Sequence, residues 1–174
     1  LNFGGKSHYY QYVAGNQSWT AAKNAAETYT MIDQGGNELT GYLVTVTSEE
    51  ENDFILTKLA ADAWMGATDS GTEGSWIWAT GPEAGTLFFD GPDDPGPGTI
   101  TSNFGTAVGG AYNAWAASEP NNWGGDEDYA HFYAANGSWN DYPEVASISG
   151  YVVEYNSETE YQPIGGQFTL SMIE

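Results

Sequence analysis

The chain has 174 residues, of which 24 are Asp or Glu, three are Lys or Arg and none is Cys, so its formal net charge is −21. This length and a hydrophobic content of 40 % suffice for one globular domain, which we expect to span residues 1–174. The charge excludes nucleic acid and disfavours anionic membranes as partners, because phosphate binding depends on Lys and Arg. The lack of Cys excludes disulfides and thiolate metal sites.

So acidic a protein is expected either in high salt, which screens its self-repulsion, or with bound cations, which neutralise part of it. Membrane insertion is not expected, since the longest apolar runs, such as Gly41–Val46, are too short to span a bilayer. Because the sequence starts at Leu1 without Met, we expect it to be either a processed product or a piece of a longer protein.

The first elements in chain order are a strand and a helix. Residues 8–13 have the composition of a strand. A helix is then expected from Trp19 to about Tyr29, with Ser18 as its N-cap.

A second helix is expected after a short strand at residues 43–46. Ser48 is its predicted N-cap, and Glu51, three residues later, completes a capping box. Its buried stripe is predicted to consist of Phe54, Ile55, Leu56 and Leu59.

The middle of the chain predicts strands and loops. Tryptophan-containing strands at residues 64–67 and 76–79 bracket a polar loop at 68–74. Residues 90–112 are rich in Gly, Pro and small polar residues, which predicts a long loop insertion without regular structure. A loop of this length in a compact domain usually has a function.

Two last strands are expected at about residues 129–133 and 150–155. A C-terminal extension follows at 156–174, with a possible further strand at 167–172. His8 and His131 are isolated in the sequence, and we interpret both as ordinary structural or surface residues.

Oxygen-bearing side chains concentrate between Glu119 and Asp141. The segment 119–128 reads Glu-Pro-Asn-Asn-Trp-Gly-Gly-Asp-Glu-Asp, and 137–141 reads Gly-Ser-Trp-Asn-Asp. Calcium binds six to eight oxygens from carboxylates, amides and carbonyls, and glycines let a loop fold around it. The spacing differs from that of an EF-hand, so we expect a calcium ion held by several separate segments.

These motifs resemble the C-type lectin-like family, and within it the calcium-dependent sugar-binding members. Glu119-Pro120-Asn121 is similar to the mannose-type motif of the family, and Trp139-Asn140-Asp141 to its Trp-Asn-Asp signature. The resemblance covers about residues 8–155. It implies an α+β fold in which two helices pack on small antiparallel sheets beside a long calcium-binding loop region, with a cis peptide bond before Pro120.

The resemblance also implies the ligands of a calcium ion that holds the sugar. They are Glu119, Asn121, Glu127, Asn140 and Asp141, with the Asp141 carbonyl as a further possible oxygen. Glutamate before the proline and asparagine after it resemble the type that prefers vicinal equatorial hydroxyls, as in mannose, glucose or N-acetylglucosamine, with fucose also accepted. Trp123 would either stack on the sugar or simply pack or lie exposed, whereas Trp139 is expected in the core.

A second, accessory calcium ion is implied as well. Its ligands would be Asp69, Glu73, Asn122, Glu127 and Asp128. Asn122 stands where the family often has aspartate.

The missing cysteines depart from the animal members of the family. Cysteine-free, acidic versions resemble modules of bacterial RTX-type adhesins, which implies an extracellular, multidomain surface protein that mediates cell adhesion through cell-surface glycans. One alternative is a calcium-stabilised domain that binds a protein or another surface, such as ice. A glycoside hydrolase is disfavoured, because carboxylates on calcium stay ionised and cannot act as the general acid.

Overall fold

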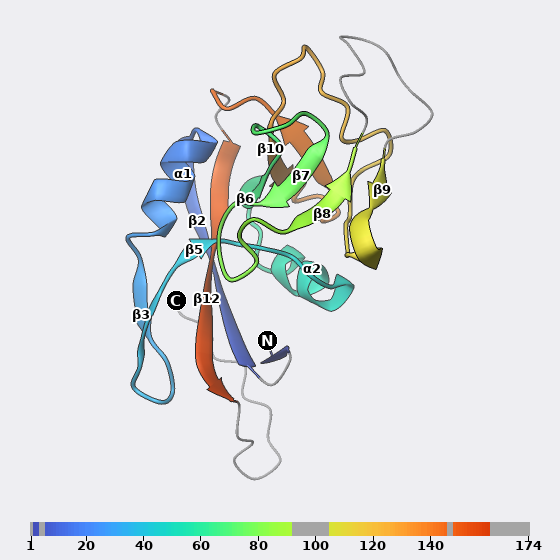
Figure 1. The fold of residues 1–174 in the computed structure, drawn as a ribbon. Coiled ribbons are helices and arrows are strands. Elements are labelled where there is room, and N and C mark those ends of the chain that lie inside the picture. Colours follow the sequence, from blue (N-terminus) through green and yellow to red (C-terminus); the bar gives the residue numbers. More distant parts are fainter. Residues whose placement is uncertain (1, 4–5, 92–104, 146–147, 161–174) are drawn as a thin grey trace.

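A computed structural model of the chain describes residues 2–3, 6–91, 105–145 and 148–160 (Figure 1). The described part is α+β, with two helices, as predicted. The helices are α1 (Trp19–Ala26) and α2 (Glu49–Leu56), and the strands are β1 (Asn2–Phe3), β2 (Lys6–Gln17), β3 (Thr30–Ile32), β4 (Glu38–Thr40), β5 (Tyr42–Leu43), β6 (Ala63–Thr68), β7 (Ser75–Trp78), β8 (Leu87–Asp90), β9 (Thr106–Ala107), β10 (Tyr129–Phe132), β11 (Trp139–Tyr142) and β12 (Ile148–Glu160).

The long antiparallel pair β2–β12 forms the centre of the fold (Figure 1). Ile148 pairs with Gln17 at one end, and Glu160 pairs with Lys6 at the other. β12 also pairs with β5 and, in parallel, with β6, so one mixed sheet of ten strands results, with β3–β4 as a separate hairpin. This corrects the prediction of small antiparallel sheets.

The two faces of the β2–β12 pair contribute to two different cores. Tyr9 and Tyr155 are register partners and lie on the side of α1 and the β3–β4 hairpin. Tyr10, Tyr12 and Val152 pack instead into the core on the other side, which contains three buried tryptophans. Strand alternation, with a period of two residues, produces this division.

The tryptophan-rich core supports β11. Trp139 is 0 % exposed, as predicted, and its indole N–H donates to Asn52 Oδ1 of α2 at 2.8 Å. Trp78 stacks on Phe88 with ring centroids 4.4 Å apart. The two residues that follow Trp139 are therefore attached to a packed strand and not to a free loop.

The predicted caps of both helices are present, but the helices end earlier than expected. Ser18 Oγ accepts from the Ala21 N–H, and α1 ends at Ala26 rather than near Tyr29. Thr30 already begins β3, which pairs with β4. In α2, Ile55 is fully buried, whereas the rest of the predicted stripe is half-buried.

Only one of the two hydrogen bonds of the predicted capping box of α2 is present. Ser48 Oγ accepts from the Glu51 N–H at 3.2 Å, but Glu51 does not bond back to Ser48. Its carboxylate accepts from the Thr47 N–H at 2.7 Å and from the Tyr10 hydroxyl at 2.6 Å. Glu51 therefore ties α2 to the β2–β12 pair.

The loop and strand predictions need four corrections. The strand expected at 43–46 is confined to Tyr42–Leu43, and β11 was not predicted. Within the expected 90–112 loop, β9 pairs with β8 and is followed by a single 3-10 turn, while residues 92–104 lie outside the described residues. β12 continues to Glu160, into the expected extension, and the strand expected at 167–172 lies outside the described residues.

We expect Ser48→Ala to lower the free energy of unfolding by about 1 kcal/mol, because the Glu51 N–H loses its acceptor at the start of α2. Urea denaturation followed by circular dichroism measures this difference. Ser48→Asn is the matched control, since its side-chain oxygen can cap the helix without adding charge, and it should unfold near the native midpoint. Equal losses in the two variants would contradict a capping role.

Candidate functional site

The candidate site is a loop, residues 118–128, held against β11. Ser118 and Asn122 have positive φ angles of 78° and 45°, and the Glu119–Pro120 peptide bond is cis, as the resemblance predicted. Gly124 and Gly125, with φ of 90° and 82°, complete the reversal of the chain. Before the loop, Trp115 forms a bridge with Trp139 of β11, and after the loop β10 pairs with β11, so both ends of the loop lie next to β11.

The carboxylate of Asp141 joins the loop to β11. Its Oδ2 accepts from the backbone N–H groups of Asn121 at 2.9 Å and Asn122 at 2.7 Å. The side-chain amide of Asn121 in turn donates to Glu119 Oε2. Three of the five predicted ligands of the sugar-site calcium, Glu119, Asn121 and Asp141, are therefore in one hydrogen-bonded group.

Glu127 closes the other end of the loop. Its Oε2 accepts from the Trp123 N–H at 2.6 Å, and its own N–H donates to Asn122 Oδ1 at 3.1 Å. Glu127 is 7 % exposed, whereas Trp123 is 64 % exposed. The Trp123 indole therefore lies at the surface beside the predicted ligands.

Asn140 is oriented by a histidine on the neighbouring strand. β10 and β11 place His131 opposite Asn140, and His131 Nε2 lies 3.2 Å from Asn140 Nδ2. His131 Nδ1 lies 3.1 Å from the Phe132 carbonyl, so Nδ1 carries the proton and Nε2 accepts from the amide. Asn140 Nδ2 also donates to the Asp141 carbonyl at 2.5 Å. The amide nitrogen is thus committed to these partners, which leaves the side-chain oxygen for a ligand.

Three buried acceptor oxygens in this region receive no hydrogen bond from the described residues. They are Asp69 Oδ1, Asn121 Oδ1 and Asp141 Oδ1. Buried polar atoms normally have a partner, and acceptor oxygens without donors are what a hard cation coordinates. The donor set, with carboxylate and amide oxygens and no sulfur, fits calcium.

Burial raises the pKa of the carboxyl groups at this loop, and for two of them the charge of Asp141 adds to the effect. Burial is the main cause for Glu119, whose pKa is raised to about 8, and the charge of Asp141 adds to it. Burial and the charge of Asp141 also raise the pKa of Glu127 to about 7. Asp141 is 1 % exposed, and burial raises its pKa although backbone N–H groups oppose this. Protons or a cation must balance this cluster.

The residues predicted for the accessory calcium lie beside this loop. Asp69 follows β6, its N–H donates to the Asp128 carbonyl at 3.2 Å, and its Oδ2 accepts from the Gly74 N–H at 2.9 Å. Burial, and then the charges of Glu73, Asp128 and Asp141, raise the pKa of Asp69 to about 8. The chain thus brings Asp69, Glu73 and Asp128 into the same electrostatic field as Asp141. Asn122 contacts the predicted ligand Glu127, because its Oδ1 accepts from the Glu127 N–H.

Sequence reasoning did not assign a role to His131, because its contact with Asn140 depends on the β10–β11 register. It also missed a cluster between α2 and the β2–β12 pair, where ligand atoms of His8, Glu51 and Glu154 lie within 4.8 Å of one another. Glu154 accepts from the Thr45 N–H at 3.2 Å and lies 2.7 Å from His8 Nδ1. Because protein groups already contact these carboxylates, we interpret the cluster as a contact that holds α2.

Residues 25–147 match the lectin C-type domain family. The chain is 37 % identical to halomucin of Haloquadratum walsbyi over 161 residues. The matched region covers 92 % of this chain but only 2 % of halomucin. No helix in the described part of the chain is both long and apolar enough to cross a membrane.

Two solved structures share the fold. The C-type lectin CEL-I from Cucumaria echinata has a TM-score of 0.59 and 24 % identity, covering 85 % of this chain and 89 % of CEL-I. The carbohydrate-recognition domain of cow CD23, solved in the presence of a GlcNAc2Man3 oligosaccharide, has a TM-score of 0.58 and 24 % identity, covering 90 % of this chain and 92 % of CD23. The predicted fold is therefore confirmed, although its sheet is mixed and it contains no cysteine. The chain belongs to the lectin C-type domain family, whose domain is a non-enzymatic binding module.

Proposed function

We propose that the chain binds sugars with vicinal equatorial hydroxyls, of the mannose, glucose, N-acetylglucosamine or fucose type, through a calcium ion. Glu119, Asn121, Glu127, Asn140 and Asp141 would hold the ion. The observation that carries the proposal is the set of buried oxygens without donors, which includes Asn121 Oδ1 and Asp141 Oδ1. Members of the family typically depend on calcium.

Calcium, when bound, supplies a centre that coordinates two neighbouring sugar hydroxyls directly. The protein side chains form hydrogen bonds with the same hydroxyls, because carboxylates accept hydrogen bonds while amides can also donate them. Glu119 and Glu127 accept from hydroxyl protons, and the Asn121 amide, which uses one of its two hydrogens for Glu119, supplies a donor. Asn140 contributes its side-chain oxygen, because its amide nitrogen already donates to His131 and to the Asp141 carbonyl. Trp123, exposed at the rim, offers an indole face to the apolar side of the sugar ring.

A second calcium ion, at Asp69, Glu73, Asn122, Glu127 and Asp128, would stabilise the loop. Its support is the donor-free Asp69 Oδ1 and the raised pKa of Asp69, whose smaller causes include the charges of Glu73 and Asp128. Because Glu127 belongs to both sites, loss of this ion would loosen the sugar site as well.

We place the chain outside the cell, as one module of a larger surface protein that adheres to glycans. The support is that the chain matches 2 % of the length of halomucin. The similarity to bacterial RTX-type adhesins stays a prediction. Single lectin sites bind weakly, so adhesion would depend on several modules together.

A glycan array in millimolar calcium tests the sugar specificity. We expect signals on mannose-like or fucosylated glycans that disappear in excess chelator. If no glycan responds while calcium still stabilises the fold, the partner is a protein or another surface, and the proposal is wrong.

Calcium should raise the melting temperature more at pH 8 than at pH 5. Without calcium, protonation of Asp69, Glu119 and Glu127 stabilises the fold below about pH 4, the ordinary carboxyl pKa, and this contribution is lost as the pH rises through their folded pKa values of about 7 to 8. Calcium competes with these protons and therefore binds best at the higher pH. Differential scanning calorimetry with calcium or chelator measures the shift.

Asp141→Asn is the control for that experiment, since it keeps the size of the side chain and removes its charge. It should lose most of the calcium-dependent shift at pH 8. A calcium shift that is as large at pH 5 as at pH 8 would show that these carboxyls do not hold the ion.

Glu119→Gln combined with Asn121→Asp should move the sugar preference toward galactose, because the exchange reverses which side of Pro120 carries the charge. Competition by free mannose and galactose for an immobilised glycan measures the preference. The matched control makes the same exchange at two exposed positions, Asn24→Asp on α1 and Glu27→Gln at its C-cap, and should leave the order of sugars unchanged. An unaltered order in the first variant would contradict the assigned site.

A further inference from the structure

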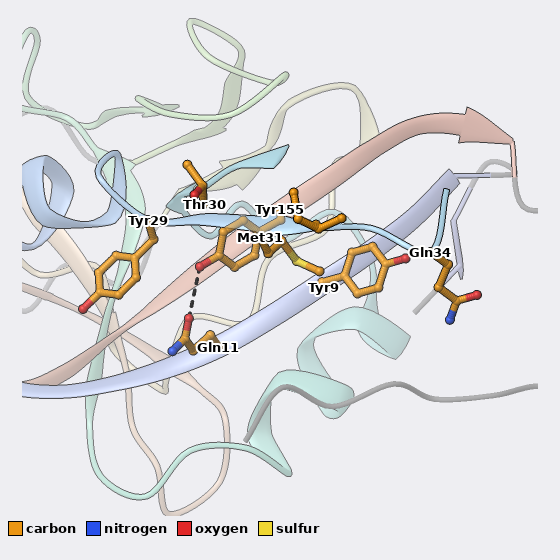
Figure 2. A pocket seen from close by; sticks show the side chains of 8 residues that line it. Tyr9, Gln11, Tyr29, Thr30, Met31, Gln34 and Tyr155 are labelled. Carbon is orange, nitrogen blue, oxygen red and sulfur yellow. Dashed lines mark hydrogen bonds between the residues drawn. The ribbon is translucent and has the colours of Figure 1, made fainter. Parts of the chain in front are cut away.

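A groove of about 520 Å³ lies between the β2–β12 pair and the segment that leads into and through β3 (Figure 2). Its walls include Tyr9 of β2, Tyr155 of β12 and Tyr29, just before β3, with Met31 between Tyr9 and Tyr155 (Figure 2). The volume lies in the range of small-molecule sites. None of its lining residues belongs to the candidate calcium ligands.

The groove is uncharged. Its eight lining residues include no Asp, Glu, Lys, Arg or His, although 24 of the 174 residues of the chain are acidic. A cationic ligand would find no carboxylate there, and an anion would be repelled by a protein of net charge −21. These facts favour a neutral ligand.

Polar groups are interspersed among the aromatic rings. The Tyr155 hydroxyl donates to Gln11 Oε1 at 3.0 Å, which fixes the Gln11 side chain on the groove wall. This bond uses the amide oxygen, so the Gln11 NH2 group keeps its donor hydrogens for a ligand. Thr30 and Gln34 add a hydroxyl and a second amide at exposed positions. A purely apolar peptide would bury the Gln11 NH2 group and the Thr30 hydroxyl without offering them a hydrogen-bond partner, which is costly.

A sugar ring matches both features, because its C–H face packs on aromatic rings while its hydroxyls bond to amides and phenols. We infer that this groove is a second sugar site, which binds a neutral pyranose residue without calcium. It uses the face of the β2–β12 pair opposite to the tryptophan core. One chain would then contact a glycan at two places with different ionic requirements, and such bivalency strengthens attachment.

Saturation-transfer NMR in excess chelator tests the inference independently of the calcium site. The probes are methyl glycosides of mannose, glucose, N-acetylglucosamine and galactose, together with maltotetraose. We expect saturation transfer to the ring C–H protons of at least one probe. No transfer to any probe would overturn the inference, while calcium-dependent signals on the glycan array would leave the calcium site supported.

Because the chain contains no Cys, a single introduced thiol can carry a bulky label that blocks the groove. Thr30→Cys places the label at the exposed rim, and Asn24→Cys, exposed on α1, is the matched control. The labelled Thr30→Cys protein should lose most of the calcium-independent transfer, and the labelled control should keep it. Transfer that persists in both would also overturn the inference. Circular dichroism of both proteins confirms that each is folded.

Discussion

The antiparallel pairing of β2 with β12 is the contact on which the rest of the structure depends. It joins residues 6–17 to residues 148–160 and gives α1 and α2 opposite sides to pack against (Figure 1). Each side then has its own chemistry. On one side Glu51 holds α2 in place, and the tryptophan core extends under β11 to the candidate loop at residues 118–128. On the other side the same strands form the wall of an uncharged aromatic groove. Strand alternation thus separates the two candidate sites.

At the candidate loop, residues 118–128, packing determines where the side chains lie, and their charges determine which ligands they could bind. Trp139 is buried and hydrogen-bonded to α2, so its neighbours Asn140 and Asp141 lie on a strand that cannot move freely. Asp141 then holds the loop through two backbone N–H groups with one oxygen, which leaves its second oxygen without a donor. Preorganised acceptors of this kind are unfavourable when empty, because the buried charges repel and lack solvent. A ligand that binds these atoms would therefore also stabilise the loop.

The sequence allowed the local features to be predicted and not the long-range ones. Ser18 and Ser48 act through residues three positions away, so both N-caps could be read from the sequence. The Glu119-Pro120-Asn121 and Trp139-Asn140-Asp141 motifs indicated the candidate site for the same reason. The turn of Glu51 toward Tyr10, the His131–Asn140 contact and the groove depend on strand registers, which join residues far apart. β11 was missed because it is four residues long and its Asn and Asp disfavour strand structure.

The composition explains why a cation, and not a protein side chain, must balance the loop. The chain has no arginine, and its three lysines are far too few for 24 carboxyls. Buried carboxylates in other proteins are commonly paired with Arg or Lys, but here only protons or metal ions are available in number. Burial raises the pKa of Glu119 and Asp69 to about 8, so these carboxyls bind protons more readily, but a bound proton removes the negative charge that the proposed calcium ion requires. With such a composition, the proposed sugar site would respond to the calcium concentration around the protein, while binding at the proposed groove site, which contains no charged residue, would be independent of that ion.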